Sequence, residues 1–465
     1  MSESQRGPAG AAGAIHSAPP LWRLLQAAAG VVAAVVDGES ATAAISRIEA
    51  GLRPGAQALA FHALRQLGRA QALRQLLARR APPAPADALL CTALALCWRE
   101  SEAPYEGFTL VDQTVEAAKR DSATRGQANF INACLRRFLR EREALVAATG
   151  QDPLAHWNHP RWWIERLKQE HPKHWEQILE ANNTQPPMTL RVNARKSNPA
   201  DYLAKLRQAG VAASAIGEHG VILERPMPVH DIPGFDAGEA SVQDAAAQLA
   251  APLLLRAIEP SQASTPTPRR LLDACAAPGG KTAHLLELAD AEVTALDIDP
   301  ARCRRIDDTL ARLGLQARVL AADAAQPPQW WDGRPFDAIL LDAPCTASGI
   351  VRRHPDVRWL RRESDIAQLT AVQARLLAAL WPLLRPGGAL LYCTCSVFRA
   401  EGEGQVQTFV AHNTDAVLRA APGHLLPRAR AKDNDVQDNL EGDHDGFYYA
   451  LLAKRAQDGS SAQIG

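Results

Sequence analysis

The chain has 465 residues, which is too long for one ordinary domain, so we expect two or three domains. Hydrophobic residues make up 47% of it and charged residues 22%, values typical of globular domains, and 51 basic residues balance 51 acidic ones. This zero net charge excludes nucleic-acid binding through a global field, so any such site must be a local patch. Eight cysteines are too few for a disulfide scaffold, and no run of 18 apolar residues is present. We therefore expect a cytoplasmic protein that does not span a membrane.

The N-terminal part of the chain predicts a helical domain. Residues 1–20 are rich in Ala, Gly, Pro and Ser and predict a disordered tail, as we also expect for residues 456–465. In residues 21–147, apolar residues recur every three and four positions and glycine is rare, a pattern that indicates a helical bundle. The basic stretch "RRFLRER", Arg136–Arg142, is either a solvated helix surface or a contact for phosphates.

Residues 148–237 predict a small α+β region. The segment "WNHPRWWIERLKQEHPKHWEQILEANN" holds two amphipathic helices that are separated at His171 and Pro172, and a strand, a helix and a strand follow. The tryptophans of this segment could stack on bases, although such residues more often belong to a core or an interdomain contact. These tryptophans are Trp157, Trp162, Trp163 and Trp175.

Residues 238–455 predict an α/β domain. Five apolar stretches that are typical of strands alternate with helical stretches, and "HDGFYYALLAKR" predicts a final strand. This alternation indicates a doubly wound, Rossmann-like parallel sheet, which binds ligands at the carboxyl ends of its strands. The residues best suited to chemistry follow the five strands in turn: Ala276–Lys281, Asp297, Asp323, Asp342–Cys345 and Cys393–Ser396.

The glycine turn "ACAAPGGKT", Ala274–Thr282, indicates a nucleoside-binding loop without a polyphosphate site. A Walker A loop needs glycine where Cys275 stands, and the spacing of a dinucleotide-binding loop is also absent. What remains is a turn that lets a ligand approach backbone amides at the start of a helix, although such a turn can also be purely structural. Asp297 lies where a carboxylate can bind ribose hydroxyls, and Asp323 where one can meet an adenine edge. S-adenosylmethionine is the candidate ligand.

Cysteines follow two of the predicted strands, in "DAPCTASG" and "YCTCS". Zinc sites prefer paired C-x₂-C units and redox sites use C-x-x-C, and neither pattern is present here. Cys393 lies within a strand and is expected to be packed in the core. Cys345 and Cys395 come after their strands end, where a thiolate can be exposed and stabilised.

A methyl donor beside a strand-end thiol favours one chemistry. C5 of a pyrimidine is a poor nucleophile, but addition of a thiolate to C6 turns C5 into an enamine-like carbon that can attack a methylsulfonium. An acid must then interact with N3 of the ring, and Asp342 is suitably placed. A base must later remove the C5 proton, and the thiol must leave.

The motifs "DACAAPGGKT", "DAPCTASGIVRRHPD" and "YCTCSV" resemble those of the RNA cytosine-5 methyltransferase family of the Sun/RsmB and NOL/NOP type. The stretches "HPRWW", "ANNTQPPMTLRVN" and "SVQDAAAQ" resemble the middle region of that family, and residues 21–147 resemble its NusB-like helical domain. The resemblance therefore covers most of the chain. It implies RNA binding by the helical domain and a role for residues 148–237 in linking the domains or in RNA binding.

The resemblance also assigns roles to single residues. It implies that Cys395 is the nucleophile and that Cys345 assists breakdown of the adduct and product release, with Asp342 and Lys281 in the catalytic site. Cys393 stands where relatives often have a small residue and inherits no role, and Asp299 is a weaker alternative to Asp297 for the ribose. The positions implied to hold S-adenosylmethionine or the target base are Cys275, Ala276, Ala277, Pro278, Gly279, Gly280, Lys281, Asp297, Asp323 and Asp342.

The stretch "RRHPDVRWLRR", directly after the second cysteine motif, combines five arginines with one tryptophan. We expect it to bind an RNA strand that enters the site, while a solvated charged helix is the alternative. The target base must leave its stack to reach Cys395. The arginines expected to contact RNA are Arg352, Arg353, Arg358, Arg361 and Arg362.

Together these observations predict an S-adenosylmethionine-dependent cytosine-5 methyltransferase of small-subunit ribosomal RNA. We expect a monomer without a metal. Two alternatives stay open: the same chemistry on transfer RNA, and a noncatalytic RNA-binding or antitermination factor that acts through the NusB-like domain.

Overall fold

The computed structural model describes residues 19–258, 268–428 and 443–456, and nearly all of the two expected tails lies outside these ranges. The chain forms two compact units, Met1–Gln151 and Asp152–Gly465. The region predicted as a small α+β linker and the predicted Rossmann-like domain therefore share the second unit.

The first unit is helical throughout its described part, as predicted. Its helices pack around α5, in which every residue from Ala88 to Cys97 is buried. A helix that is apolar on all sides is stable only when other helices surround it, and α1, α3, α4 and α6 contact this one. The helices are α1 (Leu21–Val36), α2 (Ala41–Ser46), α3 (Arg53–Arg65), α4 (Leu67–Leu77), α5 (Ala84–Cys97), α6 (Gly107–Arg120) and α7 (Ala128–Ala148), with the short turns η1 (Glu100–Glu102) and η2 (Arg125–Gln127).

The second unit begins with three short helices and a small antiparallel sheet. The sheet has the strand order β2-β3-β1-β4. The helices α8 (Pro153–Trp157), α9 (Arg161–Glu170) and α10 (Trp175–Asn182) lead to β1 (Met188–Val192), α11 (Pro199–Gln208), β2 (Ala213–Ile216), β3 (Gly220–Leu223), η3 (Val229–Asp231) and β4 (Ala240–Val242). α9 ends at the His171–Pro172 break, as predicted.

The tryptophans of the three short helices belong to a core. Trp163 is fully buried and its ring centroid lies 5.1 Å from that of Phe398 in an edge-on contact. Trp157, Trp162 and Trp175 are partly buried against the same cluster. The packing alternative is therefore right for Trp163, and base stacking by it is excluded.

The main sheet of the second unit has seven strands in the order β10-β11-β9-β8-β5-β6-β7. Its strands are β5 (Arg269–Asp273), β6 (Ala291–Asp297), β7 (Arg318–Ala321), β8 (Phe336–Asp342), β9 (Leu384–Thr394), β10 (Ala416–Leu425) and β11 (Phe447–Lys454). The strands from β9 to β7 run parallel, whereas β11 is antiparallel to both β9 and β10. The predicted Rossmann-like sheet is thus confirmed, with β11 and β10 added at one side, of which β11 runs opposite to all the other strands.

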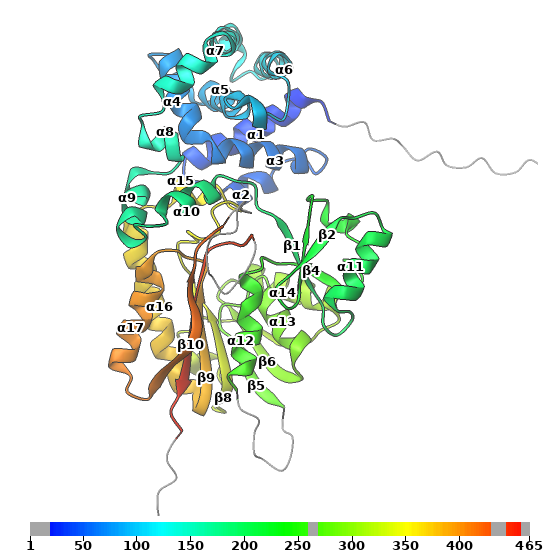
Figure 1. Cartoon of the computed structure of the whole chain (residues 1–465), viewed down its shortest axis with the longest axis vertical. Helices are drawn as coiled ribbons and strands as arrows, with labels where there is room; N and C mark the ends of the chain where they lie inside the picture. Colours follow the sequence, from blue (N-terminus) through cyan, green and yellow to red (C-terminus); the bar gives the residue numbers. More distant parts are fainter. Residues whose placement is uncertain (1–18, 259–267, 429–442, 457–465) are drawn as a thin grey trace, which may run out of the picture. The chain divides into compact units, whose positions relative to one another are not determined.

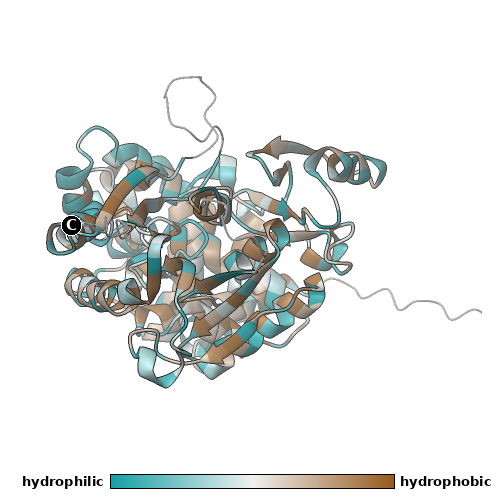
Figure 2. Ribbon diagram, turned by 90° about the horizontal axis from the view of Figure 1, so that it is seen from below, coloured by the Kyte–Doolittle hydropathy of each residue, from teal (hydrophilic) through white to brown (hydrophobic). Residues whose placement is uncertain are grey.

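Helices cover both faces of this sheet, because neighbouring strand residues point to opposite faces (Figure 1). Leu271 and Leu340 pack beneath α12, α13 and α14, while Leu272 and Ile339 pack beneath α16 and α17. In Figure 2 the helical ribbons show both brown and teal segments, as expected for helices with one buried side. Their bounds, with the remaining short helices, are η4 (Ala247–Leu249), α12 (Ala250–Arg256), α13 (Gly280–Leu288), α14 (Pro300–Leu313), η5 (Pro327–Gln329), α15 (Val357–Leu360), α16 (Ser364–Leu380), η6 (Trp381–Leu383), η7 (Arg399–Glu401) and α17 (Glu403–His412).

The segment Ser364–Leu383, formed by α16 and η6, is apolar and long enough to cross a membrane by length and composition. Polar residues interrupt its apolar run, so it contains no stretch of 18 consecutive apolar residues. In this fold Leu376, Leu377 and Leu380 are buried in the core beneath the main sheet. α16 therefore packs as a core helix of the second unit.

Candidate active site

The carboxyl ends of β5, β6, β8 and β9 meet at one edge of the main sheet, because these strands run parallel. Asp273 at the end of β5 pairs with Leu340 of β8, and Asp342 at the end of β8 pairs with Cys393 of β9. The sheet register thus brings the glycine turn, Asp342 and the two cysteine segments to a common edge, as predicted from their positions after strands.

The turn between β5 and α13 needs glycine for a physical reason. Gly279 has a φ of +95°, and a Cβ there would lie 3.1 Å from the Cα of Ile306, so both the backbone conformation and the space favour glycine. α13 begins at Gly280, and the amides of its first turn have no partner within the helix. The turn therefore leaves backbone amides open to a ligand, which fits the predicted binding of a nucleoside.

The two predicted cofactor carboxylates after β6 and β7 are already engaged within the protein. The side chain of Asp297 is 3% exposed, accepts a hydrogen bond from the amide of Asp299 at 3.1 Å and lies 3.3 Å from Arg302. Asp323 accepts a hydrogen bond from the amide of Ala325 at 2.9 Å. Asp299 caps α14 through the amide of Ala301, so it has a structural task of its own.

Lys281 and Asp342 form a close ion pair at this edge. Nζ of Lys281 lies 2.6 Å from Oδ2 of Asp342, and both side chains are mostly covered. Burial lowers the pKa of Lys281, but the charge and hydrogen bond of Asp342 and the charges of Cys393 and Cys395 together outweigh it, so that the net shift of the pKa is upward. Lys281 is therefore a cation at neutral pH, and it fixes one carboxylate oxygen of Asp342.

The sulfur atoms of Cys345 and Cys395 lie 3.4 Å apart, although 50 residues separate them in the sequence. Cys345 is buried and Cys395 is partly exposed. The hydrogen bond to Cys395, burial, and the charges of Cys395 and Glu401 all raise the pKa of the Cys345 thiol. Cys345 is therefore held as a neutral thiol beside Cys395, the less buried residue of the two.

The third cysteine of this edge behaves as a core residue. Cys393 is fully buried beneath α12, and burial raises the pKa of its thiol well above its usual value. Its sulfur lies 3.5 Å from Oδ1 of Asp342. In the described ranges of the chain, no group of three His, Cys, Asp or Glu side chains could hold a metal ion.

Two buried carboxylates at this edge were not identified from the sequence. Asp273 ends β5 fully buried, accepts a hydrogen bond from Thr282 at 2.7 Å, and has its pKa raised to about 7 by burial. Its position at the end of a predicted strand could have identified it, by the same rule that identified Asp297 and Asp342. Glu401, fully buried in η7, contacts residues of both cysteine segments, and no spacing or motif in one sequence reveals such a contact.

Three of the five arginines expected to bind RNA are engaged inside the protein, which corrects that expectation. Arg352 has no exposed side-chain area and pairs with Asp443 and Asp445, each at 2.5 Å. Arg353 is 22% exposed and pairs with Asp244 at 2.8 Å and with Asp445. These ion pairs join the start of the arginine segment to two other parts of the chain. Asp244 follows β4, and Asp443 and Asp445 precede β11.

Arg358 is also fully buried. It donates hydrogen bonds to the backbone oxygens of Asn158 and Asn182, at 3.1 and 2.6 Å. It thereby joins α15 to the ends of α8 and α10. A fully buried guanidinium that binds backbone oxygens cannot contact RNA, so its role is structural.

The last two arginines of the segment remain candidates. Arg361 is 35% exposed and donates to the backbone oxygens of Thr346 at 3.2 Å and Cys345 at 3.4 Å. It supports the loop that carries Cys345. Arg362 is exposed to solvent.

The sequence matches two family models. Residues 259–453 match the model described as 16S rRNA methyltransferase RsmB/F, and residues 159–230 match a ferredoxin-like domain described as Methyltr_RsmF/B-like. A protein of Vibrio cholerae named Ribosomal RNA small subunit methyltransferase B is 40% identical over 442 residues, which cover 92% of this chain and 97% of that protein. Its namesake from Pseudomonas syringae is 41% identical over 454 residues, which cover 94% of this chain and 98% of the relative.

Solved structures share the fold. A methyltransferase homologue from Pyrococcus horikoshii matches with a TM-score of 0.53 and 27% sequence identity, over 65% of this chain and 98% of its own. The structure of PH0851 matches with a TM-score of 0.69 and 24% identity, over 92% of this chain and 99% of its own.

Proposed function

The chain belongs to the RsmB/F family of 16S rRNA methyltransferases, and we propose that it methylates C5 of a cytosine in small-subunit ribosomal RNA with S-adenosylmethionine as the methyl donor. The observation that carries the cytosine-5 chemistry is the 3.4 Å distance between the sulfur atoms of Cys345 and Cys395 at the ligand-binding edge of the sheet. One accessible thiol and one neutral thiol in contact suit a reaction in which sulfur must both add to and leave a ring carbon.

Cys395 is the nucleophile in this proposal, because it is the less buried residue of the two. Its thiolate adds to C6 of cytosine and so makes C5 nucleophilic. Asp342, whose Oδ2 is held by Lys281, gives a proton to N3 of the ring as electron density builds up there and takes it back when the ring is restored. S-adenosylmethionine supplies an electrophilic methyl group when it is bound.

Cys345 acts later. After methyl transfer, loss of the C5 proton to a base expels Cys395 from C6 as a thiolate. The Cys345 thiol, held neutral 3.4 Å away, donates a hydrogen bond to that leaving sulfur and so stabilises it. This gives a physical reason for the release role that the family resemblance implies.

The cofactor is proposed to lie against the turn Cys275–Lys281. Glycine at 279 and 280 keeps side chains off the amides at the start of α13, which supports a close approach of the methionine part. Asp297 is proposed to bind the ribose hydroxyls and Asp323 the adenine edge. Arg302, which pairs with Asp297 and donates to the backbone oxygen of Ala277, has a half-exposed side chain and would move aside to admit the ribose.

Bisulfite sequencing of ribosomal and transfer RNA from a deletion strain tests the proposal. We expect one cytosine of the small-subunit RNA to lose its protection, and the purified protein to restore it. Loss confined to a transfer RNA would select the transfer-RNA alternative. Unchanged protection in both RNAs would overturn the cytosine-5 chemistry and favour a noncatalytic factor, which the two adjoining thiols argue against.

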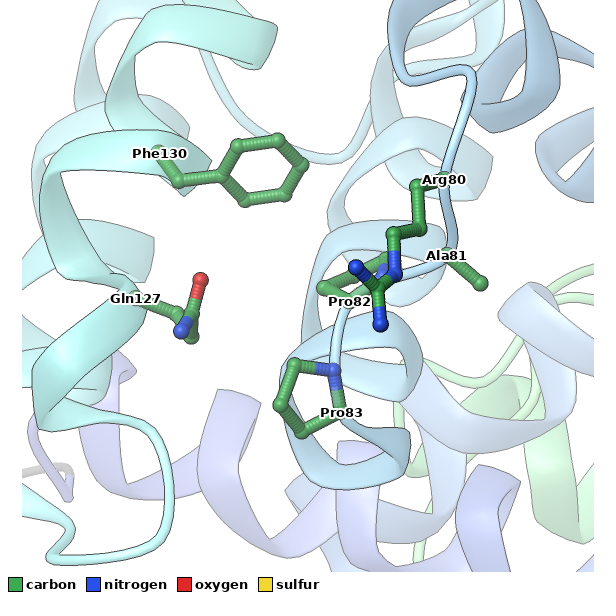
Figure 3. Close-up of a pocket in the computed structure, with 6 residues that line it drawn as sticks. All are labelled: Arg80, Ala81, Pro82, Pro83, Gln127 and Phe130. Carbon is green, nitrogen blue, oxygen red and sulfur yellow. The ribbon is translucent and has the colours of Figure 1, made fainter.

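The helical unit is proposed to contact the same RNA. Its surface has a cavity of about 440 Å³ that is lined by Arg80, Ala81, Pro82, Pro83, Gln127 and Phe130. Figure 3 shows the ring of Phe130 pointing across the cavity toward the Arg80–Pro83 loop. A flat ring with a guanidinium and an amide nearby, and no acidic side chain in the lining, suits an unpaired base.

The substitution Phe130→Ala tests this contact. Base stacking on an aromatic ring contributes about 1–3 kcal/mol, so we expect RNA affinity of the full-length protein to fall at least about fivefold. Phe108→Ala is the matched control, because Phe108 is 82% exposed on α6 and does not line the cavity. Equal RNA affinity of the two variants would remove this cavity from the RNA interface.

A further inference from the structure

A single buried carboxylate lies between the two cysteine segments. Glu401 is fully buried and its Oε1 accepts hydrogen bonds from the backbone N–H of Thr346 at 2.8 Å and from Nε2 of Gln373 at 3.3 Å. Its Oε2 accepts hydrogen bonds from the hydroxyl of Thr346 at 2.5 Å and from that of Ser396 at 2.6 Å. Four donors thus converge on one side chain.

The donors identify what this carboxylate joins. Thr346 directly follows Cys345, and Ser396 directly follows Cys395, so Glu401 binds the residue after each cysteine. Backbone hydrogen bonds connect the two segments on either side, from Ala343 to Cys393 and from Gly349 to Cys395. The loop that carries Cys345 lies between these two bonds, where Glu401 replaces the missing sheet contacts.

Glu401 is itself held in place. The hydroxyl of Tyr392 donates to the backbone oxygen of Glu401 at 2.7 Å, and Gln373 donates to the backbone oxygen of Pro344 at 2.9 Å as well as to the carboxylate. Burial raises the pKa of Glu401 above its usual value, and the hydrogen bonds from Ser396, Thr346 and Gln373 oppose this shift without cancelling it. A buried carboxylate is stable only with such a set of donors.

We propose that Glu401 is a positioning residue that holds the sulfur atoms of Cys345 and Cys395 at their working distance. It touches neither thiol through a hydrogen bond, and it acts on them through Thr346 and Ser396. The inference deepens the proposed function, on which its catalytic consequence rests. Its geometric content, the distance between two sulfur atoms, can be measured without RNA.

The geometric test is the rate at which the two thiols form a disulfide with the oxidant diamide. Both thiols lose their hydrogen to diamide, which is reduced to the hydrazine, and the sulfur atoms need to close from 3.4 Å to about 2.05 Å. Mass spectrometry of peptides identifies the Cys345–Cys395 bond among the other cysteines. We expect fast closure in the wild type, closure at least about tenfold slower in Glu401→Ala, and an intermediate rate in Glu401→Gln, which keeps one acceptor.

Glu403→Gln is the matched control. Glu403 lies two residues further on, its side chain is 46% exposed, and its closest cation, Arg399, is 3.8 Å away. This variant should form the disulfide at the wild-type rate. Equal rates in Glu401→Ala and Glu403→Gln would overturn the proposal. If Glu401→Ala does not fold, Thr346→Val and Ser396→Ala each remove one donor, and wild-type rates in both would overturn it equally.

The catalytic test is a split between kcat and KM. Misplacement of reacting groups by about 1 Å costs on the order of 100-fold in rate, so we expect a kcat loss of that size in Glu401→Ala, with an unchanged KM for RNA and partial recovery in Glu401→Gln. A raised KM with normal kcat would contradict positioning. If the wild-type protein closes the disulfide rapidly but methylates no RNA, the proposed function fails while the positioning role of Glu401 stands.

Discussion

The glycine turn after β5 and the arginine segment 352–362 were both singled out in the sequence as functional. The turn has the expected backbone conformation, whereas most of the arginines are engaged inside the protein. The turn lies at the edge of the main sheet where the parallel strands end, and Gly279 has the positive φ that a glycine turn predicts. In the arginine segment, Arg352 and Arg358 are fully buried, and their partners come from distant parts of the chain. A backbone conformation is encoded locally, whereas the role of a charge depends on which partner the fold brings to it.

The largest loss of activity is expected at the cysteines. Their motifs predicted that two cysteine segments meet at one edge of the sheet, and the sulfur atoms of Cys345 and Cys395 do lie together there. Cys395→Ala should abolish methylation and never trap RNA, because no bond to C6 can form. Cys345→Ala should leave that bond intact and accumulate a covalent protein–RNA adduct on denaturing gels, because the leaving sulfur loses its hydrogen-bond donor. Cys393→Ala is the control and should stay active. An adduct with Cys395→Ala instead would mean that the two roles are exchanged.

The next effect concerns the buried arginines. Arg352→Gln removes a buried guanidinium that pairs with two carboxylates, Asp443 and Asp445, and leaves Arg353 to balance the charge of Asp445. Breaking a buried pair in this way costs about 3–5 kcal/mol of unfolding free energy, measured by chemical denaturation. Arg362→Gln, at an exposed position of the same segment, should change it by less than about 0.5 kcal/mol. Equal stability of the two variants would mean that the ion pairs of Arg352 do not stabilise the fold.

The same difference separates the parts of the fold and the site that could be predicted from the sequence from those that could not. Alternating apolar strands and helices predicted the Rossmann-like sheet, and the strand-end rule predicted that Asp342 and the cysteine segments meet. The final strand β11 was predicted, but its antiparallel direction was not, because strand direction depends on the connection before a strand and not on its residues. Glu401 and the partners of Arg352 were missed for a related reason: a contact between distant residues leaves no periodicity in either segment.

Asp273 lies beside the glycine turn, at the end of β5, but its chemistry is set by burial and not by its local sequence. Its pKa is raised to about 7, so the folded state binds a proton more tightly than the unfolded state does. The contribution of Asp273 to the free energy of unfolding should therefore be most favourable below about pH 4. It should fall as the pH rises from about 4 to about 7, by at most about 1.4 kcal/mol for each pH unit. Asp273→Asn, which keeps an acceptor for Thr282, should remove this part of the pH dependence of unfolding. An unchanged pH profile would mean that Asp273 titrates normally.

A smaller effect is expected where the cofactor is proposed to bind. Asp297→Ala should weaken binding of S-adenosylmethionine by roughly 1.5–3 kcal/mol, the contribution of a charge-assisted hydrogen bond. Calorimetry measures it, and EDTA should not alter the affinity. Asp299→Ala is the control: its carboxylate caps α14, so stability should fall while affinity is retained. The opposite pattern would make Asp299 the ribose-binding residue.

The smallest effect should separate the two ends of the arginine segment. Each phosphate contact on a single strand contributes about 0.7 to the slope of log affinity against log salt concentration, because it releases condensed counterions. Arg362 is exposed, so Arg362→Gln should reduce the slope by about that amount for an RNA oligonucleotide. Arg353→Gln should leave the slope unchanged even where the variant is less stable, because its guanidinium is engaged by Asp244 and Asp445. A reduced slope in Arg353→Gln would show that these ion pairs open when RNA binds, and an unchanged slope in both variants would remove the whole segment from the RNA interface.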